Sequence, residues 1–239
     1  MQQYGIQISG LSKTFGRGDT AVHGLRQVNM QIEPGEVVGL IGPSGSGKST
    51  LLKCLGAIIE PSAGQMHIGD QLIYDNAWKI SDLRALRRDK IGFVFQSPYL
   101  IPFLTTLDNV ALLPMLAGIN NKEARQLALD LLTVLQVEHR AHALPSRLSG
   151  GEQQRIAIAR GLINRPPVIL ADEPTAALDS VRALTVIKTL NEIARDYKTA
   201  VIVVTHDDKI IPTFKRLYHI RDGVTYEEQG EGRSFLEKT

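Results

Sequence analysis

The distribution of hydrophobic residues along the chain predicts strands that alternate with helices. Short apolar runs bounded by turn residues predict strands at 6–9, 28–32, 37–41, 91–95, 168–171, 200–205 and 217–220. The late runs are apolar at nearly every position, which is typical of parallel strands covered by helices on both faces. The first runs alternate more and predict an antiparallel edge. The pattern therefore indicates an α/β fold.

Helical periodicity fills the stretches between these runs. Apolar residues spaced i, i+3, i+4 and i+7 extend over 124–135 and again over 183–194, and each series predicts one buried helix face. We expect a single domain in which a helical subdomain, about 96–164, is inserted into a core of about 1–95 and 165–225.

Composition narrows the class of protein. The 239 residues include 27 Lys and Arg and 25 Asp and Glu, and a net charge of +2 argues against a dedicated nucleic-acid binder. Cys54 is the one cysteine, which excludes an internal disulfide and a cysteine-based zinc site. We find neither a signal-peptide pattern nor the roughly 20 apolar residues of a membrane helix, so we expect a cytoplasmic chain. The polar tail 227–239 is expected to fray.

A glycine-rich loop follows the predicted strand 37–41. The loop GPSGSGKS, residues 42–49, leads into an apolar helix, which is the strand–loop–helix context of a P-loop. Its glycines let backbone N–H groups face a polyphosphate at a helix N-terminus. Lys48 would reach the β and γ phosphates, and Ser49 would offer its hydroxyl to Mg²⁺. A loop that merely caps a helix is the simpler alternative, but it does not explain the lysine and the hydroxyl together.

A second apolar strand, 168–171, ends in two carboxylates. Side chains at the carboxyl end of such a strand point into the crevice where α/β sheets bind ligands. Asp172 is therefore predicted to hold Mg²⁺, and Glu173 to polarise an attacking water. An Asp–Glu pair alone is most often a solvated turn, so this prediction depends on the P-loop.

The segment LSGGEQQR, residues 148–155, predicts a helix that begins at Gly150. Ser149 and Glu152 have the spacing of a capping box, and a well-capped helix is the simpler interpretation. Gly150 and Gly151 each cost a helix about 1 kcal/mol relative to alanine, however. Glycines here make sense if a ligand approaches the backbone, because a helix N-terminus with free amides binds anions.

These segments together closely resemble the ATP-binding subunit of ABC transporters. The P-loop, Gln96, LSGGEQQR, ADEPTAALD at 171–179 and His206 occur in that family's order and spacing over nearly the whole chain. The resemblance implies an ATPase that uses ATP and Mg²⁺ and forms a head-to-tail homodimer, with each ATP between the P-loop of one subunit and the LSGGEQQR segment of the other. The implied metal ligands are Ser49, Gln96 and Asp172, and the implied catalytic residues are Glu173, His206 and Gln96. The implied nucleotide-binding residues are Phe15, Gly42, Ser44, Gly45, Ser46, Gly47, Lys48, Ser49, Thr50, Ser149, Gly150, Gly151, Gln153 and Asp179.

The resemblance also implies a partner. Phe15 falls where the family places an aromatic residue that stacks on adenine, and a core phenylalanine is the alternative. In the family, the segment after Gln96, residues 97–110, lines a groove for a membrane permease, although its apolar residues could equally be core. The segments 83–96 and 100–110 resemble the macrolide-export and lipoprotein-release branch, and DEPTAALDS favours its glycolipid or haem exporters. We therefore expect an export ATPase at the cytoplasmic face of the inner membrane.

Three other functions share part of this motif set. An ATPase that regulates a cell-envelope complex, as in cell division, would carry the same motifs. DNA-repair relatives carry long coiled-coil or zinc insertions that this sequence lacks. A P-loop kinase would not need LSGGEQQR.

Overall fold

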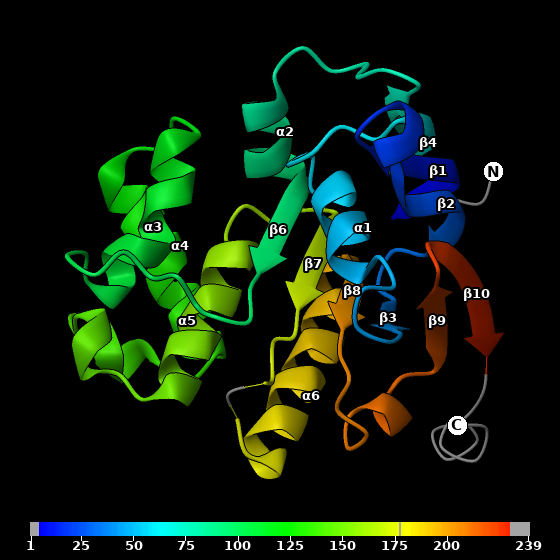
Figure 1. Ribbon diagram of the computed structural model, residues 1–239. Coiled ribbons are helices and arrows are strands. Elements are labelled where there is room, and N and C mark those ends of the chain that lie inside the picture. The colour runs from blue at the N-terminus through cyan, green and yellow to red at the C-terminus, as the bar shows by residue number, and fades with distance from the viewer. Residues whose placement is uncertain (1–4, 177, 230–239) are drawn as a thin grey trace.

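The computed structural model describes residues 5–176 and 178–229, which form two sheets and a group of helices (Figure 1). The larger sheet has the strand order β10-β9-β3-β8-β7-β6. Its neighbouring strands are parallel except for β10, which runs antiparallel to β9. These strands are β3 (Val37–Ile41), β6 (Ile91–Val94), β7 (Val168–Asp172), β8 (Ala200–Val204), β9 (Arg216–Arg221) and β10 (Val224–Gln229). The predicted α/β fold with a mixed sheet is confirmed.

The smaller sheet is antiparallel throughout and has the order β2-β1-β4-β5. Its strands are β1 (Ile6–Phe15), β2 (Val22–Ile32), β4 (Ala63–Ile68) and β5 (Gln71–Asp75). The first strands are antiparallel, as expected, and they lie in a sheet of their own.

The sequence pattern did not predict three of the strands. The strands β4, β5 and β10 are short and carry glycine or several polar residues, so cross-strand pairing rather than intrinsic preference sustains them. The expectation of a frayed tail was wrong for 227–229, which belong to β10 and pair with β9. The rest of that tail, 230–239, lies outside the described residues.

Helices cover both faces of the larger sheet. Side chains of β8 alternate between two hydrophobic cores, because successive residues of a strand point to opposite faces. One core packs β8 against α6 and the helices α3 to α5, and the other packs it against α1 and the smaller sheet. The helices are α1 (Lys48–Leu55), α2 (Leu83–Lys90), α3 (Thr106–Leu116), α4 (Asn121–Val134), α5 (Gly150–Leu162) and α6 (Ser180–Tyr197), with 3₁₀ turns at Gly18–Thr20, Glu138–Arg140, Pro145–Arg147 and Ile211–Thr213.

This topology brings the candidate motifs to one edge of the larger sheet. The strands β3, β8 and β7 are parallel neighbours, so the P-loop after β3, the carboxylates at the end of β7 and His206 after β8 lie at the same edge. The helices α3, α4 and α5 form a separate group beside β6 (Figure 1). Within the described residues, none of the helices combines the length and apolar character needed to cross a bilayer.

Candidate active site

An open cleft of about 640 Å³ lies at this edge of the sheet. It is lined by the predicted residues Phe15, Gly42, Ser44, Gly45, Gly47, Lys48, Ser49, Thr50, Gln96, Asp172, Glu173 and His206. Phe15 is 43% exposed, which excludes the alternative of a core phenylalanine. Ser46 is the one predicted P-loop residue that does not line the cleft, because its side chain is buried.

The P-loop backbone takes the shape that its glycines permit. Gly45 and Gly47 have φ of +79° and +112°, in the left-handed region that favours glycine. Gly47 is the N-cap of α1 and offers no side-chain oxygen, so the first amides of α1 remain available to a ligand. The Lys48 ammonium folds back over the loop and donates to the carbonyl oxygens of Gly42 at 2.6 Å and Pro43 at 2.8 Å. A positive charge and free amides therefore meet in one place.

The two carboxylates at the end of β7, Asp172 and Glu173, differ in environment. Burial raises the pKa of Asp172, and the neighbouring charge of Glu173 raises it further, while Lys48 opposes both effects. Glu173 has a left-handed φ of +49°, and its N–H donates to the Val204 carbonyl of β8 at 3.0 Å. This bend directs the Glu173 carboxylate to His206, whose Nδ1 lies 2.6 Å from Oε1. The motifs predicted both residues but gave no indication of this contact.

The LSGGEQQR segment forms the capped helix start that its spacing predicts. The Ser149 hydroxyl accepts from the Glu152 N–H, and the Glu152 carboxylate accepts from the Ser149 N–H at 2.7 Å. Arg140 Nε also donates to Glu152 at 2.7 Å. These donors, Arg140 first, lower the pKa of Glu152 to about 2. An added Cβ on Gly150 would meet no atom of the described chain within 4 Å, so this helix end is open.

The remaining predicted residues lie away from the cleft. Gln153 donates to the Pro145 and Leu148 carbonyl oxygens, and Asp179 caps α6 by accepting from the Arg182 N–H. Among the described residues, the cleft contains none of Ser149, Gly150, Gly151, Gln153 and Asp179. One chain thus has two separate groups of candidate ligand-binding residues.

Sequence reasoning missed four residues that line the cleft: Val22, His23 and Gly24 of β2, and Val204 at the end of β8. Of these, Gly24 carried a signal in the sequence. The Gly24 backbone lies so close to two other cleft residues that an added Cβ would be 2.9 Å from the Phe15 ring and 3.2 Å from Thr50 Cγ2. A glycine inside a strand was the available signal, since it marks a close approach of backbone or ligand.

Comparison with known proteins decides the family. The family model described as ABC transporter matches residues 25–176, which cover both the P-loop and the carboxylates after β7. The chain belongs to the ABC transporter family. As a member of this family it is an ATP-binding cassette ATPase.

Individual relatives of this ABC ATPase cover nearly the whole chain. The lipoprotein-releasing system ATP-binding protein LolD of Idiomarina loihiensis is 41% identical over 225 residues, covering 94% of this chain and 98% of LolD. The putative hemin import ATP-binding protein HrtA of Staphylococcus haemolyticus is 39% identical, covering 91% and 97%. The similarity to LolD agrees with the predicted lipoprotein-release branch.

A solved structure supports both fold and chemistry. It is a dimeric post-hydrolysis state of the ATP-binding cassette MJ0796 of Methanocaldococcus jannaschii, bound to ADP and Pi. It superposes on this ABC ATPase with a TM-score of 0.82 and 39% identity, covering 94% of this chain and 98% of the other.

Proposed function

We propose that this ABC ATPase dimerises head to tail around two ATP molecules and drives a separate membrane permease, in the export direction, from the cytoplasmic face of the membrane. The separation of the cleft from the open start of α5 carries the proposal. A helix N-terminus binds phosphate, so each chain supplies one half of each of two sites, and only a second copy can complete them. The MJ0796 cassette, whose solved structure is a dimer bound to ADP and Pi, supports dimerisation.

Within the cleft, Lys48 would neutralise phosphate charge while Ser49, Gln96 and Asp172 hold Mg²⁺. The described residues contain no group of three His, Cys, Asp or Glu that could hold a metal ion alone. A hydroxyl, an amide and one carboxylate, completed by phosphate oxygens and water, are a set that suits Mg²⁺. Mg²⁺ would supply neutralisation of the phosphate oxygens. A cation here also fits because it would stabilise the charged form of Asp172, whose pKa is raised by burial and by the neighbouring Glu173 charge.

Glu173 would act as the base that orients the attacking water. Its contact with His206 fixes the carboxylate at the end of β7, beside the P-loop. Loss of a general base slows a reaction by roughly 10²- to 10⁴-fold. We therefore expect Glu173→Gln to lower kcat by this factor while MgATP still binds. Glu192→Gln is the control, because it makes the same substitution at an exposed position on α6. Full ATPase activity of Glu173→Gln would show that Glu173 is not the base.

A groove between α2, β6 and the helices α3 and α5 is the proposed permease site. Its volume is about 700 Å³, and Phe93, Phe95, Leu113 and Leu116 line it together with four arginines. Tyr99 and Phe103, in the segment after Gln96, are 71% and 79% exposed, which excludes a core role for these two side chains. An exposed apolar surface of this kind marks a docking site.

The charge of the groove points to an acidic partner. The groove is lined by four arginines, Arg84, Arg87, Arg88 and Arg160, and by one carboxylate, Asp82. Of these four arginines, in the part of the chain that the structure describes, Arg88 alone has a carboxylate partner within ion-pair distance, Asp89. Arg160 instead donates to the carbonyl oxygens of Pro98 and Tyr99, and burial lowers its pKa. An amphipathic segment of the permease with carboxylates facing these arginines would complement the groove.

The test is copurification from detergent-solubilised membranes with MgATP in the Glu173→Gln background. We expect a stoichiometric membrane protein with the parent. We expect this protein to be lost from the double variant Arg84→Glu, Arg87→Glu but kept in the control Arg195→Glu, whose side chain is exposed near the end of α6. Retention at the parent's level in the double variant would refute docking in the groove, whereas recovery of the ATPase alone with the parent would refute the permease. ATP-driven export by the purified complex in vesicles tests the direction.

A further inference from the structure

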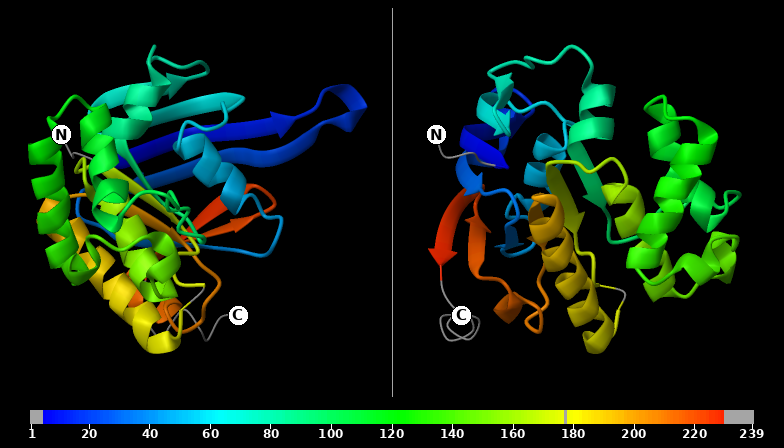
Figure 2. Two further views of the ribbon diagram at one scale, coloured as in Figure 1. Left: turned by 90° about the vertical axis from the view of Figure 1, so that its left-hand side faces the viewer. Right: turned by 180° about the vertical axis from the view of Figure 1, so that it is seen from behind.

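The turn between β9 and β10 is in contact with the P-loop. The strand β9 pairs in parallel with β3 up to Ile41 and His219, so its next residue lies beside the start of the loop. An added Cβ on Gly42 would fall 2.2 Å from the Ile220 carbonyl oxygen. At the turn itself, the Gly223 N–H donates to the Ser46 carbonyl oxygen at 3.0 Å. Figure 2 shows this hairpin, with β9 in orange and β10 in red, near the start of α1.

This hydrogen bond sets the direction of a P-loop amide. The Ser46 carbonyl and the Gly47 N–H belong to one planar trans peptide, and in such a unit they point in opposite directions. Holding the Ser46 oxygen on the turn therefore aims the Gly47 N–H away from the hairpin, on the side where Gly47 lines the cleft. We propose that the Asp222–Gly223 turn is a positioning element for nucleotide, because it keeps this N–H facing the phosphates. The inference rests on the proposed role of the P-loop.

The turn has little freedom to move. Asp222 and Gly223 have φ of +50° and +79°, the pair of left-handed residues that a two-residue hairpin turn requires. An added Cβ on Gly223 would lie 3.1 Å from the Gly24 oxygen, and one on Gly47 would lie 2.6 Å from the same atom. The Gly223 oxygen also accepts from the Arg26 N–H of β2 at 2.7 Å. Turn, β2 and P-loop are therefore in direct backbone contact.

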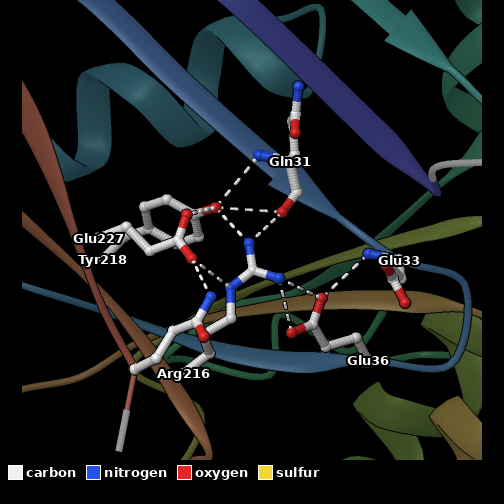
Figure 3. Close-up of polar contacts among 7 residues, drawn as sticks. Gln31, Glu33, Glu36, Arg216, Tyr218 and Glu227 are labelled. Carbon is white, nitrogen blue, oxygen red and sulfur yellow. Dashed lines mark hydrogen bonds and ion pairs between the residues drawn. The ribbon is translucent and has the colours of Figure 1, made fainter.

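The other end of the hairpin is anchored by a polar network (Figure 3). Arg216, at the start of β9, donates to both carboxylate oxygens of Glu36 at 2.9 and 3.0 Å and forms an ion pair with Glu227 of β10 at 3.2 Å. Its guanidinium also donates to the Gln31 carbonyl oxygen of β2 and to the Tyr218 hydroxyl. The Arg216 side chain is only 16% exposed, so solvent does not compete strongly for these contacts. Because these contacts hold the end of the hairpin opposite the turn, the turn keeps a fixed position against the P-loop.

The test compares Gly223→Ala with Gly69→Ala. Gly69 also has a positive φ, +57°, but it lies in the β4–β5 turn, where an added Cβ meets no described atom within 4 Å. We expect Gly223→Ala to weaken MgADP binding by about 5- to 30-fold, which corresponds to about 1–2 kcal/mol. The KM for ATP should rise similarly while kcat stays within twofold, because Glu173 and His206 are untouched. Gly69→Ala should lower Tm without changing KM.

Three outcomes are decisive. A folded Gly223→Ala variant that binds MgADP within twofold of the parent would overturn the inference. If that variant does not fold, Thr225→Val decides, because it removes two hydrogen bonds between the Thr225 hydroxyl of β10 and the Asn29 backbone of β2 without straining the turn. We expect about 2- to 5-fold weaker binding, and unchanged binding would overturn the inference. Failure of the parent protein to bind MgADP would instead refute the P-loop assignment.

Discussion

The start of α5 offers a stability test of the LSGGEQQR segment through Glu152. In the parent chain, the Ser149 N–H and Arg140 Nε each donate to a carboxylate oxygen of Glu152 at 2.7 Å. Glu152→Gln keeps the size of the side chain but leaves a single acceptor oxygen for these two donors. One hydrogen bond to a charged group is lost, and an amide NH₂ faces a donor. Since bonds to charged groups each contribute about 1.5–3 kcal/mol, we expect a loss of about 2–3 kcal/mol. For a chain of this size that lowers Tm by about 4–12 °C.

Thermal unfolding by circular dichroism or calorimetry without nucleotide measures this loss. Glu192→Gln is the matched control, because Glu192 pairs with Lys188 at 3.9 Å on an exposed helix face, where such pairs contribute about 0.3–0.5 kcal/mol. We expect the control to move Tm by less than about 2 °C. Equal Tm values for the two variants would refute the assignment of structural energy to the capping box.

The same comparison has a defined pH dependence. The folded-state pKa of Glu152 lies near 2, below its ordinary value of 4.5, so the folded state favours the charged form. The stabilisation is therefore complete above about pH 4.5 and disappears as the pH falls toward 2. We expect the stability difference between the parent and Glu152→Gln to be constant from pH 5 to 7 and to shrink below pH 4.5. A difference that stays unchanged at pH 3 would contradict the assigned pKa.

Three further predictions concern nucleotide binding. Lys48→Ala should weaken MgATP binding at least tenfold, whereas Lys53→Ala, later on α1, should not, and equal affinities by calorimetric titration would count against the P-loop assignment. Phe15→Ala should raise the KM for ATP about 5- to 150-fold because a base–aromatic stack contributes about 1–3 kcal/mol, while Phe15→Tyr should keep it; an unchanged KM in Phe15→Ala would refute the stack. Gly150→Ala should leave Tm equal or higher, since the helix start is open, yet reduce ATP-driven dimerisation of the Glu173→Gln background in light scattering; undiminished dimers would show that Gly150 lies outside the interface.

Much of this protein was determined by short-range patterns in the sequence. Period-2 and period-3.6 spacing located the buried strands and the helices α4 and α6, because each element buries its own apolar face. The capping box placed the start of α5 at Gly150, since its two hydrogen bonds connect residues three apart. The P-loop motif likewise placed a free helix N-terminus after β3.

Only the tertiary structure decided what depends on contacts between distant segments. The strands β4, β5 and β10 exist because neighbouring strands pair with them, and such pairing leaves no mark in a short polar run. The contact of Glu173 with His206 and the support of Ser46 by Gly223 each join elements that are far apart in the chain. Local spacing cannot encode these distances, because they follow from the order and register of strands in the sheet. The motifs thus predict the chemistry, and the sheet topology brings together the residues that would perform it.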